Sequence, residues 1–145
     1  LFGYFLTWMQ EKTAQVFVVT TANDISVLPP ELLRKGRFDE IFYVDFPNEA
    51  ERKAIFRVHL DKRKKMNQQI DLHKLAKATD KYSGADIESI VKEGIERAFL
   101  ANRAELDTQR LMQVIEATHP LGMVMKDKVK QYQNRFAEMK IKSAS

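Results

Sequence analysis

The chain has 145 residues, of which 44% are apolar and 30% charged, a balance typical of a globular protein and not of a disordered segment. Its formal net charge of +4 permits contact with nucleic acid or acidic partners but does not require it. The lack of cysteine excludes a disulfide framework and thiolate metal sites, and it fits a reducing compartment such as the cytoplasm. The apolar opening, 1–9, is too short to span a bilayer and lacks the basic flank of a signal peptide.

Apolar residues at the start of the chain recur at helical spacing. Leu1, Phe5, Trp8 and Met9 are spaced in this way and no capping residue precedes them, so we expect the chain to begin inside an amphipathic helix. Two interpretations are open at this point. The segment is either a short buried helix of a complete domain or a helix within a larger protein of which this is the carboxyl-terminal piece.

The stretch 16–47 carries the most informative pattern of the chain. Val16–Val19 is an apolar run rich in β-branched residues, which predicts a strand buried on both faces. The run leads to Asn23, which places a carboxamide at the sheet edge where open α/β sheets bind their ligands. A second strand is predicted over Ile41–Phe46 and ends at Pro47.

A helical turn is predicted between these two strands. Pro29 and Pro30 suit the start of the turn, where proline is tolerated, and Gly36 marks its end. The turn presents Arg34 and Arg37 three residues apart, a spacing that places two guanidinium groups on one side.

After the second strand, four segments have helical periodicity, and capping side chains precede three of them. The predicted helices cover about 48–61, a short segment after Asp71, a long segment after Ser83, and about 108–118. The residues expected to face the core are Leu72, Leu75, Ala76, Ile87, Ile90, Val91, Ala98, Phe99, Leu111, Val114 and Ile115. The basic run Lys62–Lys65 is more typical of a solvated hinge than of a nucleic-acid patch, because no aromatic residues interleave with it.

The tail after Pro120 has a heptad-like apolar stripe. Its members are Met125, Val129, Tyr132, Phe136 and Met139, spaced alternately by four and three residues. Two heptads are too few to indicate a coiled coil, so we expect the stripe to pack on its own domain. Packing of this helix against a partner is the alternative.

The segments T-A-N-D and L-P-P-E-L-L-R-K-G-R-F-D, with the proline-terminated strand after them, resemble the second region of homology of the AAA ATPases. The segment W-M-Q-E-K-T (8–13) is similar to the stand-alone AAA proteins of cyanobacteria and plastids. The resemblance implies a carboxyl-terminal remnant of the α/β P-loop AAA+ core with two parallel-type strands, followed by an α-helical lid, mostly helical overall. It divides the chain into 1–47 for the α/β remnant, 48–118 for the lid and 119–145 for a carboxyl-terminal helix or tail.

An AAA core also needs a G-x-x-x-x-G-K-[ST] phosphate loop and an acidic strand end for Mg²⁺, and the sequence has neither. We therefore expect a carboxyl-terminal piece of a larger protein, without ATPase activity when alone. The parent is expected to bind ATP with Mg²⁺ and to couple hydrolysis to macromolecular remodelling, as a ring, expected to be a hexamer, of like subunits in the cytoplasm. The alternative is a non-catalytic AAA-derived module that binds a partner protein or nucleic acid.

Three residues take part in catalysis if the resemblance holds. Asn23 corresponds to sensor 1, which positions the attacking water, and the alternative is an ordinary strand-terminating asparagine. Arg34 and Arg37 correspond to arginine fingers that reach the nucleotide site of the neighbouring subunit, since guanidinium is planar, forked and permanently charged. A solvated pair of surface arginines is the alternative for these two.

Four further residues are implied to contact the adenine base. Ile55 and His59 stand four apart on one helix face, and Gly84 and Ala85 belong to the G-A-D segment of the lid. Ala85 stands where many relatives have the sensor 2 arginine. His59 is equally well interpreted as a partly buried structural histidine. The sequence has three histidines and no H-E-x-x-H motif, which argues against a zinc site and a zinc-type AAA protease.

Overall fold

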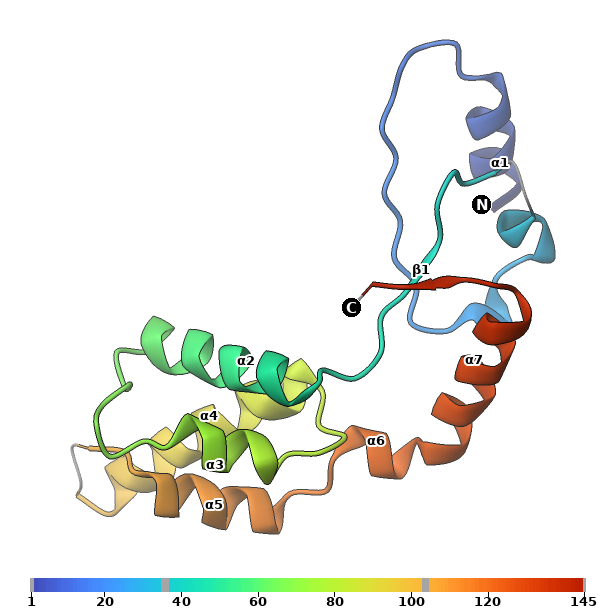
Figure 1. Cartoon of the computed structure of the whole chain (residues 1–145). Coiled ribbons are helices and arrows are strands. Elements are labelled where there is room, and N and C mark those ends of the chain that lie inside the picture. Colours follow the sequence, from blue (N-terminus) through green and yellow to red (C-terminus); the bar gives the residue numbers. More distant parts are fainter. Residues whose placement is uncertain (1, 35–36, 103–104, 145) are drawn as a thin grey trace. The chain divides into compact units, whose positions relative to one another are not determined.

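The computed structural model describes residues 2–34, 37–102 and 105–144, and the chain forms two compact units, Leu1–Phe42 and Tyr43–Ser145 (Figure 1). The first unit is mostly irregular chain with one helix of three turns. The second unit is mostly helical and contains the hydrophobic core. The expectation of a mostly helical chain is therefore confirmed.

The first unit begins with the helix α1 (Phe2–Glu11), which confirms the helix predicted at the start of the chain. Two short 3₁₀ turns follow, Ile25–Val27 and Pro30–Leu33. The second of them is the predicted helical turn, with proline in its first positions and a buried leucine, Leu32. The residue expected to end this turn, Gly36, lies outside the described residues.

The strand predicted over Val16–Val19 is wrong. This run is irregular, and three of its four side chains are exposed, with Phe17 93% exposed and Val19 73% exposed. A strand is stable only when a neighbouring strand takes up its backbone N–H and C=O groups, and no segment that the structure describes pairs with this one. The apolar run therefore has no sheet in which to be buried.

The second predicted strand, Ile41–Phe46, is reduced to the two residues of β1 (Phe42–Tyr43). The strand β1 pairs with β2 (Lys142–Ser143), and the amide nitrogen of Ala144 lies 2.9 Å from the carbonyl oxygen of Tyr43, to which it donates. The expectation of two parallel-type strands is therefore wrong for the described residues, because β1 pairs with the tail instead.

Four helices follow β1, and we call them together the lid. They are α2 (Glu49–Lys62), α3 (Leu72–Lys77), α4 (Gly84–Leu100) and α5 (Thr108–Ala117). All four confirm predicted helices: α2 and α5 agree within one residue at each end, and α3 and α4 begin directly after the predicted caps. The capping boxes at Asn48 and Ser83 and the cap at Asp71 form as the sequence indicates, and Asp107 adds a cap that the sequence analysis missed.

The core of the lid lies between these four helices, where α2 packs on α3 and α4 and α5 packs on α3 and α4 (Figure 1). Its largest fully buried apolar side chains are Phe56, Leu60, Leu75, Ile87, Ile90, Val91, Leu106, Leu111 and Val114. The predicted inward position of Phe99 is wrong, since this side chain is 79% exposed. In the last turn of α4 the inward position belongs to Ala98, and the next residue points about 100° further round the helix.

The tail forms two helices, α6 (Leu121–Val124) and α7 (Lys126–Glu138), with Met125 between them. The stripe is half-buried along α7. The ring of Phe136 stacks on the ring of Tyr43 with centroids 4.4 Å apart, a contact within the second unit. This contact supports packing of the stripe on its own unit, the interpretation favoured from the sequence.

Candidate functional site

Two of the residues implied to contact adenine, Ile55 and Gly84, are neighbours in the lid. Ile55 and His59 lie one turn apart on α2, both half-buried, and α4 begins at Gly84. A Cβ atom on Gly84 would lie 3.9 Å from Cδ1 of Ile55, so the glycine backbone and the isoleucine side chain are neighbours. Ala85 follows in the first turn of α4 and is exposed. The structure thus brings together residues that are about 30 positions apart in sequence.

A polar cluster surrounds His59 on the same two helices. Arg63, at the end of α2, donates from Nη2 to Oε1 of Glu88 on α4 over 2.8 Å. Its Nη1 lies 3.2 Å from Nδ1 of His59, and Lys92 lies 3.1 Å from the same Glu88 oxygen. Hydrogen bonds from Lys92 and Arg63 hold the pKa of Glu88 below its ordinary value.

Sequence reasoning missed this cluster. The spacing of four residues that joins His59 to Arg63, and Glu88 to Lys92, is the one available signal. That signal does not show that the two pairs meet, because the pairing of α2 with α4 depends on the packing of the core. The cluster therefore emerges only from the three-dimensional arrangement.

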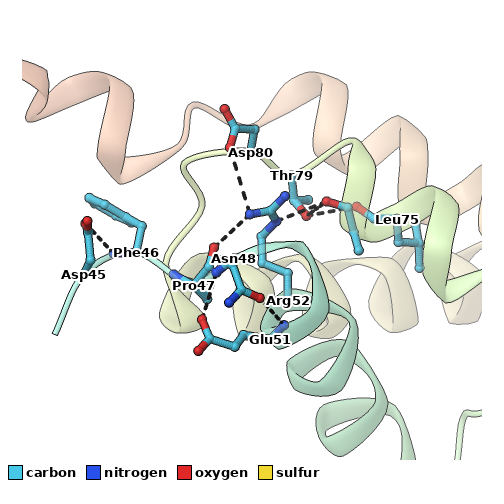
Figure 2. Close-up of polar contacts among 10 residues, drawn as sticks. Asp45, Phe46, Pro47, Asn48, Glu51, Arg52, Leu75, Thr79 and Asp80 are labelled. Carbon is cyan, nitrogen blue, oxygen red and sulfur yellow. Dashed lines mark hydrogen bonds and ion pairs between the residues drawn. The ribbon is translucent and has the colours of Figure 1, made fainter. Parts of the chain in front are cut away.

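Another charged residue that the sequence analysis missed, outside this cluster, lies at the start of α2. Arg52 is buried at 6% exposure, and it donates from Nε to the carbonyl of Ala76 over 3.0 Å and from Nη1 to the carbonyl of Pro47 over 2.8 Å (Figure 2). The carboxylate of Asp80, which is largely exposed, lies 3.9 Å away. The hydroxyl of Thr79 donates to the carbonyl of Ala76 as well, over 3.2 Å.

These bonds tie the chain that enters α2 to the carboxyl end of α3. The last carbonyl groups of a helix carry negative partial charge and can accept further hydrogen bonds, which suits a buried guanidinium. Arg52, which lies one turn before Ile55, therefore holds the start of α2 against the end of α3.

The three residues implied in catalysis lie in the first unit, and the structure does not place Asn23 at a strand end. Asn23 is exposed in an irregular segment. Arg34 is exposed at the end of the 3₁₀ turn, and its carbonyl accepts from the amide of Arg37 over 3.3 Å. Arg37 is partly buried, and its guanidinium faces the carboxamide of Gln10 on α1, whose oxygen can accept from it.

Other kinds of site find no support in the described part of the chain. Within it, no three acidic, histidine or cysteine side chains stand close enough to hold a metal ion. None of its helices combines the length and the apolar character needed to cross a membrane.

Comparison with known proteins matches two parts of the chain to family models. Residues 1–46 match the model of the ATPase family associated with various cellular activities (AAA), and residues 69–113 match the AAA+ lid domain. The second range lies within the lid and includes Gly84 and Ala85. The first includes Asn23, Arg34 and Arg37.

Named relatives support the same family. The AAA domain-containing protein ycf46 of Pyropia yezoensis is 44% identical over 146 residues, which cover 100% of this chain and 30% of that protein. The protein of the same name from Guillardia theta is 41% identical over 146 residues, 100% of this chain and 29% of its own length. The ATP-dependent zinc metalloprotease FtsH 1 of Sphaerobacter thermophilus is 37% identical over 106 residues, 73% of this chain and 16% of its own length.

The chain thus spans less than a third of the length of the curated relatives it matches. The two family models agree with the order of elements in the structure, in which the lid helices follow a unit with the R-K-G-R-F-D segment. The similarity to plastid-type AAA proteins also agrees with the resemblance of the segment 8–13. The chain belongs to the AAA+ ATPases, in which it comprises part of the AAA domain and the helical lid.

Proposed function

We propose that this chain supplies the sensor 1 residue, the arginine fingers and the lid of an ATPase that remodels a macromolecular client as a ring of like subunits. The observation that carries the proposal is the meeting of Ile55 and Gly84 beside His59, in a chain that matches the AAA and lid families. These residues come from two helices of one well-packed core. A site built on helices holds its residues more firmly than one built on loops.

The lid residues fit an adenine base. Gly84 has no side chain, so the space that a Cβ would fill beside Ile55 is open to a flat ring. Ile55 offers an apolar surface, and His59 offers a ring nitrogen for a polar edge. ATP with Mg²⁺, when bound, supplies the phosphoryl group and the cation that neutralises its charge. The Mg²⁺ ligands are proposed to lie outside these 145 residues.

In the first unit, Asn23 is proposed to orient the attacking water, which requires a neutral group that both donates and accepts. Arg34 and Arg37 are proposed to act on the nucleotide of the neighbouring subunit. Their permanent charge and forked donors suit phosphate oxygens. The exposure of Asn23 and Arg34 supports roles at a surface that another part of the protein covers.

The first test measures ATP turnover and nucleotide affinity in the full-length protein. Asn23→Ala is expected to lower turnover roughly a hundred- to a thousand-fold with affinity kept, as for other positioned donors. Ser26→Ala, in the same exposed segment, serves as the matched control and is expected to keep normal turnover. A protein that binds no adenine nucleotide would instead favour the non-catalytic interaction module.

The second test asks whether the arginines act between subunits. Arg34→Ala is expected to abolish turnover and keep ATP binding, since a finger from a neighbour contributes on the order of 10³ to 10⁵ in rate. Mixing this variant with subunits that keep both arginines but lack the Mg²⁺ carboxylate is expected to restore activity. Mixed rings that exchange subunits and stay inactive would contradict action in trans.

The chain alone gives a third test. It is expected to show no ATPase activity, because it has no phosphate-binding loop. Turnover above background by the purified 145-residue chain, with contaminating ATPases excluded, would contradict this part of the proposal.

A further inference from the structure

The contact between Arg63 and His59 determines which imidazole nitrogen is an acceptor. Nη1 of Arg63 lies 3.2 Å from Nδ1 of His59 and 3.2 Å from the carbonyl oxygen of the same residue. A guanidinium group has only donors and does not lose its proton in proteins. Nδ1 must therefore present its lone pair to Arg63, and the neutral ring then carries its proton on Nε2.

In the alternative tautomer, Nδ1 carries the proton and would donate a hydrogen bond to Glu88. The distance from Nδ1 to Oε1 of Glu88 is 3.9 Å, beyond hydrogen-bond range. That oxygen already accepts from Arg63 at 2.8 Å and from Lys92 at 3.1 Å. Glu88 thus acts on the imidazole indirectly, by holding the guanidinium against Nδ1.

The side chains that make these contacts are partly buried, which strengthens the hydrogen bonds between them. The side chains of His59 and Arg63 are 20% and 21% exposed, and that of Glu88 is 35% exposed. Partial burial strengthens a charge-assisted hydrogen bond relative to one in water. None of the described residues forms a hydrogen bond with Nε2 of His59, so its N–H is available to a ligand.

We propose that Arg63 and Glu88 are positioning residues that hold His59 in the Nε2–H tautomer, so that His59 donates a hydrogen bond to an acceptor atom of a bound adenine nucleotide. This inference rests on the proposed function for the identity of the ligand. The tautomer itself depends only on contacts within the lid. The ligand atom is then a ring nitrogen or a ribose oxygen, because an exocyclic amine would offer a second donor.

The direct test is a ¹⁵N NMR measurement of the histidine ring nitrogens in the 145-residue chain at about pH 8, above the ordinary histidine range. The His59 signals are identified by their loss in His59→Gln. The expected result is a protonated Nε2 and an unprotonated Nδ1. A protonated Nδ1 in the unsubstituted chain would overturn the proposal without the need for any further variant.

Two variants separate positioning from a general structural effect. Arg63→Met removes the donor to Nδ1 and is expected to shift His59 towards a mixture of tautomers. Lys92→Met removes the other cation on Glu88 but does not touch His59, and it is expected to leave the tautomer unchanged. Equal spectra for Arg63→Met and the unsubstituted chain, with the helical circular dichroism signal intact, would overturn the role of Arg63.

Nucleotide binding by the full-length protein supplies the second readout, with a fluorescent adenine nucleotide as the probe. Arg63→Met is expected to weaken binding roughly three- to ten-fold, the range of one hydrogen bond, and Lys92→Met less than about two-fold. Equal weakening by both variants would overturn the positioning role. A full-length protein that binds no adenine nucleotide would overturn the proposed function and the ligand named here, whereas the NMR result tests the tautomer separately.

Discussion

The lid buries a core of apolar side chains, whereas the unit Leu1–Phe42 leaves many of its own in solvent. Phe56 on α2 is fully buried, and Phe17 in the irregular run of the first unit is 93% exposed. The difference follows from where each element finds its backbone hydrogen bonds. A helix makes them within itself and needs only one apolar face against a neighbour, but a strand needs another strand beside it. Helices drawn from one continuous segment can therefore form a core that such a strand cannot.

The largest contrast is expected from the same substitution in the two units. Phe56→Ala removes a fully buried ring and is expected to lower the free energy of unfolding by about 3–5 kcal/mol. Phe17→Ala removes an exposed ring and is expected to change it by less than about 0.5 kcal/mol. Chemical denaturation of both variants measures the difference, and equal costs would show that the two regions do not differ in packing.

A smaller effect is expected from the buried arginine that joins the start of α2 to α3. Arg52→Met leaves the carbonyl of Pro47 without its donor and is expected to cost about 1–3 kcal/mol in the free energy of unfolding. Lys53→Met, at the next and exposed position, is the control and is expected to stay within about 0.5 kcal/mol. If both variants unfold at the same denaturant concentration, the bonds to Pro47 and Ala76 do not stabilise the lid.

Two glycines offer a third comparison. A Cβ on Gly122 of α6 would lie 2.5 Å from the carbonyl oxygen of Lys81, so Gly122→Ala must displace α6 from the lid, at about 1–2 kcal/mol. A Cβ on Gly3 of α1 meets no atom within 4 Å, so Gly3→Ala is expected to be neutral or to stabilise α1 by up to about 1 kcal/mol. Thermal unfolding of both variants shows whether each substitution raises or lowers stability. A Gly122→Ala variant more stable than the unsubstituted chain would contradict the close contact of Gly122 with the carbonyl of Lys81.

The smallest effect concerns high pH. Tyr82 is buried in the lid, and its hydroxyl contacts the carbonyl oxygens of Ile115 and Thr118 at 3.2 and 3.0 Å. Burial, and then the charge of Asp86, raises the pKa of Tyr82. Because the folded-state pKa is raised, this contribution to stability is complete below the ordinary tyrosine value of about 10 and is lost as pH rises through the folded value.

The alkaline loss of stability is expected to shrink in Tyr82→Phe when denaturant midpoints are compared between pH 8 and 11. A remainder is expected because burial raises the pKa of Tyr43 as well. Tyr4→Phe, at a residue 82% exposed on α1, is the control that should keep the full loss. If Tyr82→Phe loses as much stability between pH 8 and 11 as the unsubstituted chain, the loss does not come from ionisation of Tyr82.

The sequence was sufficient for the parts of the fold that local rules decide. The capping boxes at Asn48 and Ser83 mark helix starts within a few residues, and the apolar spacing of α4 identifies its inner face as far as Ala98. The starts of all four lid helices could therefore be predicted, and the ends of α2 and α5 as well. The family resemblance then singled out Ile55 and Gly84, which the structure brings together.

The rest depends on contacts between distant segments. Val16–Val19 has the composition of a buried strand, but composition does not say whether a partner strand is present to pair with it. In the sequence Arg52 resembles an ordinary surface cation, and its bond to Ala76 depends on the end of α3 lying beside α2. Arg63 contacts Glu88 only because α2 packs on α4. The roles of Asn23, Arg34 and Arg37 stay predictions, since they concern a nucleotide and a neighbouring subunit.

The lid is a self-sufficient core that presents the residues proposed to contact adenine, whereas the described part of the first unit does not form a sheet by itself. Hydrogen exchange of the 145-residue chain, read amide by amide, measures this difference between the two units. We expect slow exchange, close to the limit set by global unfolding, for α2 and α4, and nearly unprotected exchange for Val16–Val19. Protection of Val16–Val19 equal to that of α4 would contradict this difference.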